Sequence, residues 1–466
     1  MSLLTALLDN GKIYNFEQAF GVKDITSRAM KAAIQDWAAL YYDQETTERE
    51  DPCQRIPVTI VAKLTKTAFS EYEATAAKHS DYITSILGAL YDCRKKAMQQ
   101  ALIGGCCYLK PIFGPSGLSF SVISRGNYIA LGRDERDRLT EIGTAERTVQ
   151  GKTYYTLLER RRVDAGGYLT IESRLYSSDD ETTLGYQVPL NTLEKYAALV
   201  DSFTYPVPVG SLGLIPLRVP LENTVDGSPD PVSVYAPASA LIHNINRNEA
   251  QLNLEFSNGE SRIIVPDSML RRGKDGRRGL NDHVFVGAPM LPEEANIAIF
   301  SPELREASFL ARKTEYLRNV ESLIGLKRGL LSEVEAQERT AKEITSSEGD
   351  YNLTIIDFQE MWETAVREAV RVCDILGRMY RVYTGPEIDP VKDVAISWGN
   401  GILYDEDKVW TEYKYLVSAG LLKPEIAVGW YFDMPTETPA DLEKVREKYM
   451  PEIEQLLDDG SGGGDV

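Results

Sequence analysis

The amino-acid sequence predicts a predominantly helical α+β protein. In the first 100 residues, Asp24–Tyr42 and Lys63–Gln100 carry apolar residues at spacings of three and four, which is the period of a helix. Leu118–Pro189 instead contains short stretches of alternating apolar and polar residues, separated by Gly, Asp and Ser, as in an antiparallel sheet. The longest periodic segment, Ala341–Val382, would span roughly 60 Å as one helix. That length is more usual in an elongated structural subunit than in the core of a compact enzyme.

The N-terminal half is expected to fold as one α+β region, residues 1–230. An apolar run, Ala101–Phe113, is broken by Gly104 and Gly105 and ends at a Gly-Pro-Ser-Gly turn. Asn223–Asp230 is rich in Gly, Pro and Asp, and we expect it to be the linker to the next part of the chain. The stretches expected to form strands are Leu118–Ile123, Tyr154–Glu159, Tyr168–Leu175 and Gly185–Pro189.

A helix, an insert and a second helix are expected to follow. The first helix, residues 236–257, has Pro237 in its first turn. Its apolar stripe of Leu241, Ile245, Leu252 and Phe256 is diluted by Asn244, Asn246, Asn248 and Asn253. A helix this polar has little core of its own to bury, so it needs neighbours from outside its domain.

The insert, residues 259–301, contains two strand-like runs, Arg262–Val265 and His283–Val286. The second helix runs from Pro302 to about Leu326. In it, Leu310, Leu317 and Ile324 recur every seven residues, which is typical of a helix–helix contact.

The long helix is predicted to begin after Thr340, because Thr340-Ala-Lys-Glu343 fits a capping box. Gly385–Pro390 ends it, and Val394–Trp398 is expected to be a strand. Two further helices are predicted at Asp405–Ala419 and Pro439–Leu457. The Gly- and Asp-rich tail that follows is expected to be disordered.

The charge balance excludes tight binding of nucleic acid by the whole chain. The 466 residues include 51 basic and 70 acidic ones, a net charge of −19. Tight binding to phosphates needs a basic face. The balance remains compatible with a protein past which DNA slides without sticking, and also with an ordinary soluble acidic protein.

The sequence contains no pattern that predicts an active site, a metal site or a cofactor. It has no phosphate-binding P-loop, and the nearest glycine cluster, Gly273–Gly279, lacks the lysine and hydroxyl residue that complete one. Nucleophile-elbow and zinc-binding patterns are absent too, and the five cysteines form no C-x-x-C pair. Acidic clusters such as Asp405–Asp407 could supply paired carboxylates for hydrolysis, but solvated loops explain them as well. We also expect no membrane segment, because no apolar run approaches the ~20 residues needed to span a bilayer.

The insert carries a locally basic run. Its cations, set against Asp267 and Asp275, give a net charge of +3 within an acidic chain. The run is either a solvated loop or a docking surface for an acidic partner, for which arginine offers two-pronged contacts. The cations are Arg271, Arg272, Lys274, Arg277 and Arg278.

These elements, in this order, resemble the portal proteins of siphophages. The Thr340-Ala-Lys-Glu343 box at the head of the long helix resembles the threonine–alanine–x–glutamate signature of that family. Glu321–Leu326 resembles the isoleucine/glycine/leucine end of the helix that returns from the family's insert. Ala101–Phe113 resembles the family's glycine-containing strand region, although the acidic residue often found between those glycines is absent here. Further similar segments are Ser233–Pro266, Ile396–Asp405 and Leu416–Leu422.

The resemblance implies a structural subunit rather than an enzyme, assembled into a cyclic ring, a dodecamer, around a DNA channel. Its regions would be a wing, stem, clip and crown. The wing would comprise residues 1–230 and 384–404, and the stem helices 231–258 and 302–326. The clip insert would be 259–301, the tunnel loop 327–339, the long wing/crown helix 340–383, and the crown helices with the acidic tail 405–466.

The same resemblance implies partners and places. The ring would lie at one vertex of the capsid in the virion, after assembly in the host cytoplasm. The clip would dock the terminase large subunit and later the head-completion adaptor, while capsid and scaffolding proteins surround the ring. Double-stranded DNA would pass the tunnel-loop cations Lys327, Arg328 and Arg339 without sequence preference. Two other classes stay open: another structural head component, such as a minor capsid protein, and an acidic cytosolic hydrolase.

Overall fold

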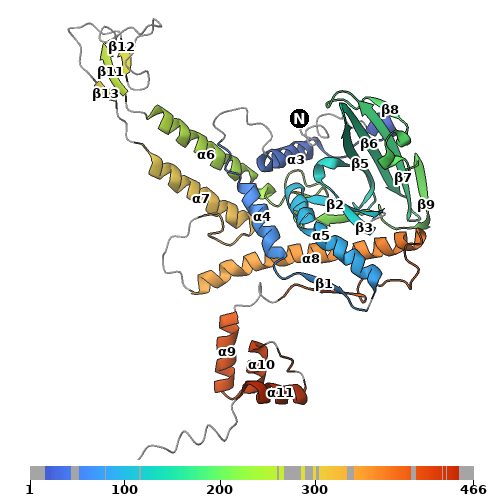
Figure 1. Cartoon of the computed structure of the whole chain (residues 1–466). Helices are drawn as coiled ribbons and strands as arrows, with labels where there is room; N and C mark the ends of the chain where they lie inside the picture. The colour runs from blue at the N-terminus through green and yellow to red at the C-terminus, as the bar shows by residue number, and fades with distance from the viewer. Residues whose placement is uncertain are drawn as a thin grey trace, which may run out of the picture. The chain divides into compact units, whose positions relative to one another are not determined.

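The structure is a computed structural model, and Figure 1 shows the whole chain. It describes residues 16–42, 52–78, 80–114, 117–259, 262–266, 285–288, 298–300, 304–332, 341–399, 406–432, 434–436 and 438–450. The chain divides into two compact units, Met1–Ser397 and Trp398–Val466. Helix and sheet both contribute to the first unit, which confirms the predicted α+β class.

Four helices open the first unit: α2 (Phe16–Phe20), α3 (Arg28–Tyr41), α4 (Ile56–Ala68) and α5 (Asp81–Gly104). Serine side chains cap two of them, since Ser27 accepts a bond from Met30 N and Ser80 accepts one from Ile83 N. The prediction of one helical segment over Lys63–Gln100 is wrong. The chain leaves the helix after Ala68 and forms strand β1 (Glu73–Ala76), which pairs antiparallel with β14 (Val394–Ser397). Hydrogen bonds to a strand more than 300 residues away override the local period.

Helix α5 passes directly into strand β2 (Cys106–Gly114) through Gly105. Gly105 has a φ of +81°, and a Cβ there would lie 2.6 Å from the backbone of Pro231 and Val232. Only glycine fits, because it both adopts this left-handed conformation and lets the second segment approach. β2 is the central strand of a three-stranded sheet, between β10 (Ile215–Arg218) and β3 (Gly117–Ile123).

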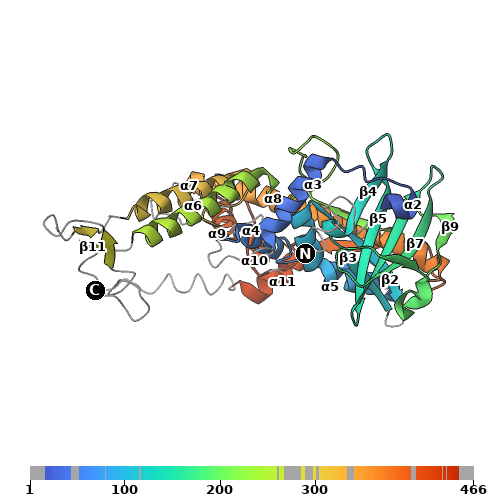
Figure 2. The ribbon, with the colours of Figure 1, turned by 90° about the horizontal axis from the view of Figure 1, so that it is seen from above.

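A six-stranded sheet forms the body of the first unit (Figure 2). Its order is β4 (Tyr128–Arg133), β5 (Leu139–Gln150), β6 (Thr153–Val163), β7 (Tyr168–Ser178) and β8 (Tyr186–Val188), with β9 (Ser202–Pro208) also paired to β7. All these pairs are antiparallel, as the alternating pattern predicted. The alternating pattern predicted β3, β6, β7 and β8, whereas β4, β5, β9 and β10 were not predicted.

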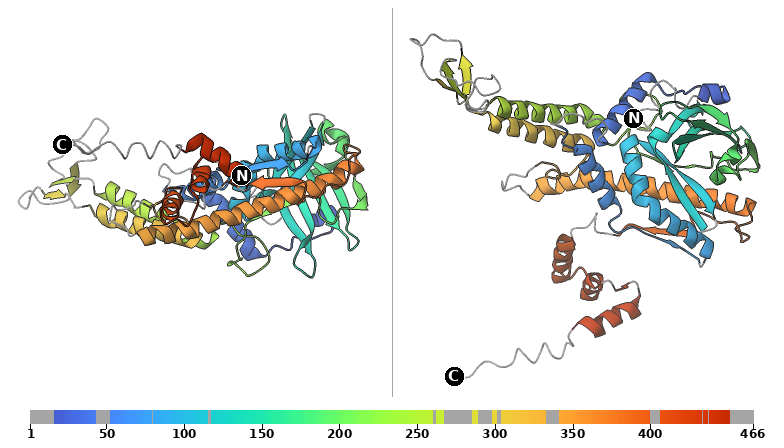
Figure 3. Two further views of the ribbon diagram at one scale, coloured as in Figure 1. Left: turned by 90° about the horizontal axis from the view of Figure 1, so that it is seen from below. Right: turned by 45° about the horizontal axis from the view of Figure 1, so that its top comes forward.

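The long helix α8 (Ala341–Met379) packs against α4, α5 and β10 (Figure 3). The helical period of this segment selects ten residues, and seven of them are buried: Ile355, Phe358, Trp362, Val366, Val370, Cys373 and Leu376. Of the other three, Tyr351 is partly buried and Tyr380 is exposed, while the burial of Ile344 is outside what the structure describes. Trp362 is fully buried and meets the Phe69 ring edge-on at 5.3 Å. Thr340 lies outside the described residues, so the capping box stays a prediction.

Between β10 and α8 the chain forms a short 3₁₀ turn, η4 (Ala236–Ala238), and helices α6 (Ser239–Asn258) and α7 (Glu306–Ile324). The insert between these helices has strands β11 (Arg262–Pro266), β12 (Phe285–Ala288) and β13 (Ala298–Phe300), in the order β12-β11-β13. β11 begins at the predicted residue, and β12 begins two residues later than predicted.

The second unit contains helices α9 (Glu406–Ser418), α10 (Pro424–Tyr431) and α11 (Pro439–Tyr449). The sequence predicted α9 and the start of α11. The described helices share an aromatic cluster in which Trp410 stacks on Trp430 at 6.4 Å and Phe432 stacks on Tyr449 at 4.1 Å. These ring contacts connect the described helices of the unit, although Phe432 itself is 47% exposed.

Candidate functional site

Helices α6 and α7 form an antiparallel hairpin (Figures 1 and 3). Arg305, just before α7, makes two hydrogen bonds, at 2.9 and 2.6 Å, to the carboxylate of Glu255 near the end of α6. About two turns further along, Lys313 Nζ lies 3.1 Å from the carboxylate of Glu249. The partner numbers decrease along α6 as they increase along α7, so the helices run in opposite directions.

The interior of this hairpin is partly polar. Asn248 is buried, and its Nδ2 donates to the carbonyl of Phe309 at 3.1 Å. Its Oδ1 is also buried and has no hydrogen-bond partner within the described part of the chain. A buried oxygen left in this state costs free energy. The hairpin therefore gains less from its own core than an apolar pair of helices would.

Several large apolar side chains of the hairpin are exposed instead. The buried ones include Ile245 and Leu252, as the sequence predicted. Phe256 and Leu310, which were also expected to be buried, are exposed, as are Leu254 and Leu323. The residues that recur every seven positions in α7 therefore make only part of their contacts within one chain, because Leu310 is exposed. These side chains are available for contact with other chains.

A buried carboxylate anchors the loop that follows α7. Glu321 has no exposed surface and accepts bonds from the backbone N–H groups of Gly329, Leu331 and Ser332, at 3.3, 2.5 and 2.9 Å. The Ser332 hydroxyl donates a fourth bond, at 2.8 Å. Four donors converge on one carboxylate, which satisfies the buried charge and fixes residues 329–332 to the last turn of the helix.

Two other features hold this loop, a backbone turn at its start and a hydrogen bond from α4. Gly325 ends α7 with a φ of +73°, which turns the chain back. On the far side, Lys63 of α4 donates from Nζ to the carbonyl of Leu330 at 2.7 Å. The loop is therefore held at both of its sides.

Of the predicted tunnel-loop cations, Lys327 and Arg328 are on this anchored loop, and both side chains are exposed. Arg339 lies outside the described residues, so the structure does not test whether the three cations come together. Sequence reasoning missed Glu321. The available signal was its position on the same face as Val320 and Ile324, where an acidic residue is expected only if it has buried partners.

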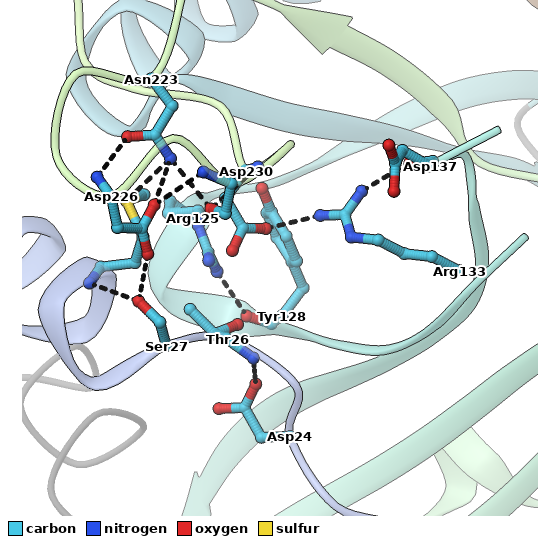
Figure 4. A network of polar contacts seen from close by, with 12 residues as sticks. Asp24, Thr26, Ser27, Arg125, Tyr128, Arg133, Asp137, Asn223, Asp226 and Asp230 are labelled. Carbon is cyan, nitrogen blue, oxygen red and sulfur yellow. Dashed lines mark hydrogen bonds and ion pairs between the residues drawn. The ribbon is translucent and has the colours of Figure 1, made fainter. Parts of the chain in front are cut away.

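The predicted linker Asn223–Asp230 is a structured segment, in contrast to the expectation (Figure 4). The side chain of Asn223 donates to Asp226 at 2.9 Å and to Ser228 at 3.0 Å. Asp226 in turn accepts a bond from Ser27, the residue that caps α3. These bonds attach the segment to the N-terminal helices.

A buried ion pair continues this attachment (Figure 4). Arg133, at the end of β4, donates from Nη2 to Asp230 at 2.6 Å and from Nη1 to the carbonyl of Asp137 at 2.8 Å. Downstream, the buried Ser233 donates to the carbonyl of Leu102, and Tyr235 donates to that of Trp37, at 3.0 and 2.8 Å. The start of the hairpin is therefore fixed to the sheet and to α3 and α5.

The predicted clip cations Arg271, Arg272, Lys274, Arg277 and Arg278 lie outside the described residues. Their roles stay predictions. The same holds for the acidic tail after residue 450.

The buried cysteines carry no reactive thiolate near neutral pH. Cys106, Cys107 and Cys373 are buried, whereas Cys53 and Cys93 are partly exposed. Burial raises the pKa of the Cys106 thiol to about 11 and that of Cys373 to about 12, so both are protonated near neutral pH. Among the described residues, no three His, Cys, Asp or Glu side chains come together to hold a metal ion. None of the helices in that part of the chain has the length and apolarity needed to span a membrane.

A model of one protein family matches this chain. Its description is "Phage portal protein, SPP1 Gp6-like", and it matches residues 96–458, well over half of the 466 residues. The matched range includes the sheet of β2, β3 and β10, the six-stranded sheet, the hairpin, the anchored loop and the long helix. Among the curated proteins, none matches the chain. The match agrees with the resemblance seen in the order of the sequence motifs, and the chain belongs to the siphophage-type family of phage portal proteins.

Proposed function

We propose that this protein forms a ring, a dodecamer, at one vertex of the phage capsid and that DNA enters and leaves through its centre. Phage portal proteins are structural proteins rather than enzymes. The ring would dock the terminase large subunit during packaging and the head-completion adaptor afterwards, with capsid and scaffolding proteins around it. It would assemble in the host cytoplasm and remain in the virion.

The observation that carries this proposal is the hairpin of α6 and α7 with its anchored loop. The hairpin exposes Leu254, Phe256, Leu310 and Leu323, and its own interior is partly polar. Burying these side chains against neighbouring copies would release about 25 cal/mol for each Å² of apolar surface removed from water. A head-to-tail contact of this kind, in which two different faces meet, closes into a ring under cyclic symmetry.

The anchored loop is a second observation in favour of a central DNA channel. It presents two cations, Lys327 and Arg328, at a position fixed by Glu321 and Lys63. Within an acidic chain, a small number of cations per subunit can centre the DNA by transient phosphate contacts. Many fixed phosphate contacts would instead hold the duplex and oppose its movement.

The proposed regions are those that the resemblance to phage portal proteins implies. The wing would be residues 1–230 and 384–404, and the stem would be 231–258 and 302–326. The clip would be 259–301 and the tunnel loop 327–339. Residues 340–383 would form the long wing/crown helix, and 405–466 the crown.

Negative-stain electron microscopy of the purified protein tests the proposal. We expect closed rings with a central hole, and a mass by light scattering that is a large multiple of 52.1 kDa. A stable, folded monomer at micromolar concentration and at every salt concentration would contradict it. Open filaments or shells without a central hole would instead favour another structural head component.

A further inference from the structure

A cavity lies beside the six-stranded sheet of the first unit, away from the hairpin and the anchored loop. It has a volume of about 620 Å³ and lies between strands β2, β6, β7 and β9 and the C-terminal end of α8. Its wall is largely apolar and includes Phe113, Ile171 and Leu376. A cavity of this size holds one or two side chains of a partner.

The rim of this cavity is an exposed apolar surface. Leu199 and Val200 come from the loop before β9, Phe203 from β9, and Tyr380 and Val382 from the chain beyond α8. Val200 is 55% exposed and Val382 is 56% exposed. Five large apolar side chains from two segments that are distant in sequence, residues 199–203 and 380–382, gather around one opening, which differs from apolar residues scattered singly over a surface.

The base of the cavity is ionic. Glu159, almost fully buried, lies between Lys110 Nζ at 2.8 Å and Arg161 Nε at 2.5 Å. Arg161 also donates from Nη1 to the carbonyl of Leu212 at 3.1 Å. One carboxylate and two cations give the base a net charge of +1, inside a chain whose total is −19.

Lys110 is the member of this triad that can reach a ligand. Its side chain keeps 26% of its exposure, against 5% for Glu159 and 6% for Arg161. An ammonium group has three N–H donors, and the bond to Glu159 uses one of them. A carboxylate that entered the cavity would meet this amine in a partly desolvated place, where a charge-assisted bond is stronger than in water.

We propose that this cavity binds a peptide segment of a partner protein in which an acidic residue stands between two apolar ones. The apolar side chains would cover the rim, and the carboxylate would bond to Lys110. Nucleic acid fits poorly, because the rim offers apolar surface where phosphates need donors. A small apolar carboxylate would fill the cavity but leave most of the rim exposed. The proposal does not depend on ring formation, since one chain supplies every residue of the site.

Fluorescence polarisation with synthetic peptides tests this inference on the full chain. The probe is a labelled peptide, Ser-Gly-Phe-Asp-Leu-Gly-Ser, with its C-terminus amidated so that aspartate is its only carboxylate. The comparison peptides replace Asp by Asn, or replace Phe and Leu by Ser. We expect saturable binding of the first peptide and at least fivefold weaker binding of the other two.

Variants of the chain identify the site. Lys110→Met should abolish the preference for Asp over Asn, and Lys110→Arg should keep it. Val200→Asp and Val382→Asp should each weaken binding at least fivefold. Val149→Asp is the matched control, because Val149 has the same 56% exposure but does not line the cavity. Melting curves of each variant should match that of the parent chain, so that a binding loss is not a folding loss.

Four results would overturn the inference. One is equal binding of the Asp and Asn peptides by the parent chain, and another is equal weakening by Val149→Asp and Val382→Asp. A third is saturable binding of octanoate at the site with no binding of the peptide, which would identify a small-molecule pocket. The last is a changed mass of the assembly in Val382→Asp, which would identify a second copy of the chain as the occupant.

Discussion

The carboxylate of Glu321 accepts hydrogen bonds from both the backbone N–H and the hydroxyl of Ser332, at 2.9 and 2.8 Å. The two residues are eleven positions apart, so their contact closes the intervening chain into a loop at the end of α7. Lys327 and Arg328 lie within that loop. The position of both cations therefore depends on one buried carboxylate.

Replacing Glu321 by Ala should release the loop. The change leaves up to four donors without their acceptor, and each buried donor left unsatisfied costs about 1–3 kcal/mol unless water reaches it. We expect a destabilisation of about 3 kcal/mol in urea unfolding, and at least tenfold faster trypsin cleavage after Lys327 and Arg328. Glu315→Ala, at an exposed glutamate of the same helix, is the control. An unchanged rate of cleavage in the Glu321 variant would show that other contacts hold the loop.

Reversing Lys327 and Arg328 to Glu should leave ring assembly unaffected and shorten or destabilise the packaged DNA. The reason is that the transient phosphate contacts that centre the duplex would become repulsive. Packaged length by pulsed-field electrophoresis and retention after heating measure the effect. Lys152→Glu with Arg162→Glu, at exposed cations just before and on strand β6, is the matched control. If the double variant of the loop packages full-length DNA and retains it normally, Lys327 and Arg328 have only a structural role.

Replacing Leu254 and Leu310 by Asp should weaken the association of subunits. Both side chains are exposed in the single chain, so its fold should be preserved, whereas a contact between copies would have to bury two new charges. We expect native mass spectrometry to show monomers or small oligomers and circular dichroism to match the parent chain. Val149→Asp should keep the full assembly mass. A double variant that forms complete rings would place the contact between copies elsewhere.

Serine in place of Arg271, Arg272, Arg277 and Arg278 should leave rings intact and weaken partner binding. The run has a net charge of +3, and complementary charge speeds and orients docking. Pull-down with the terminase large subunit and with the head-completion adaptor, at two salt concentrations, measures how much partner binding is weakened. The control makes the same serine replacement at four exposed cations of the first unit: Arg136, Lys152, Arg162 and Arg218. Undiminished capture of both partners would count against a docking role.

The free energy of unfolding should fall in acid as Glu159 becomes protonated. Its burial opposes the charged form, but the charges of Arg161 and Lys110 outweigh that effect and lower its pKa from 4.5 to about 2. Because the pKa is lower in the folded state, the stabilisation is fully present above pH 4.5 and is lost as the pH falls towards 2. The size of the shift corresponds to about 3 kcal/mol.

The comparison with Glu159→Gln isolates this contribution, because the amide does not titrate. In urea unfolding, the advantage of the parent chain over the variant should be constant above pH 5 and should shrink between pH 4.5 and 2. The exposed Glu222→Gln should show no comparable change. A constant advantage of the parent down to pH 2 would mean that the pKa of Glu159 is the same in the folded and unfolded states, so that folding does not lower it.

The sequence predicted the elements whose signal is local. Seven of the buried positions of α8 could be named from their spacing, because a helix with one buried face must repeat its apolar residues every three or four positions. The alternation that located β3, β6, β7 and β8 has the same origin in the strand. Strand β4 was missed because its buried residues, Tyr128–Leu131, form a continuous apolar run and not an alternation. Strand β5 was missed because its buried positions include Gly143 and Thr144, which carry little apolar signal.

The sites depend on residues that are distant in the chain. The ion pair of Arg133 with Asp230 joins positions 97 apart, and that of Lys110 with Glu159 joins positions 49 apart. Nothing in the neighbourhood of either residue names its partner. For the same reason a Gly- and Pro-rich stretch looked like a linker, although its polar side chains bond to α3 and to β4.

The sequence by itself determined the α+β class, the long helix, the helix–insert–helix order and the family to which that order belongs. The tertiary structure decided that Glu321 fixes the loop of Lys327 and Arg328, and that Lys110, Glu159 and Arg161 lie beneath an apolar rim. The physical reason is the range of the forces that act. Periodic burial selects secondary structure from neighbouring residues, whereas a buried charge is stable only beside its counter-charges and donors, and folding alone brings these together.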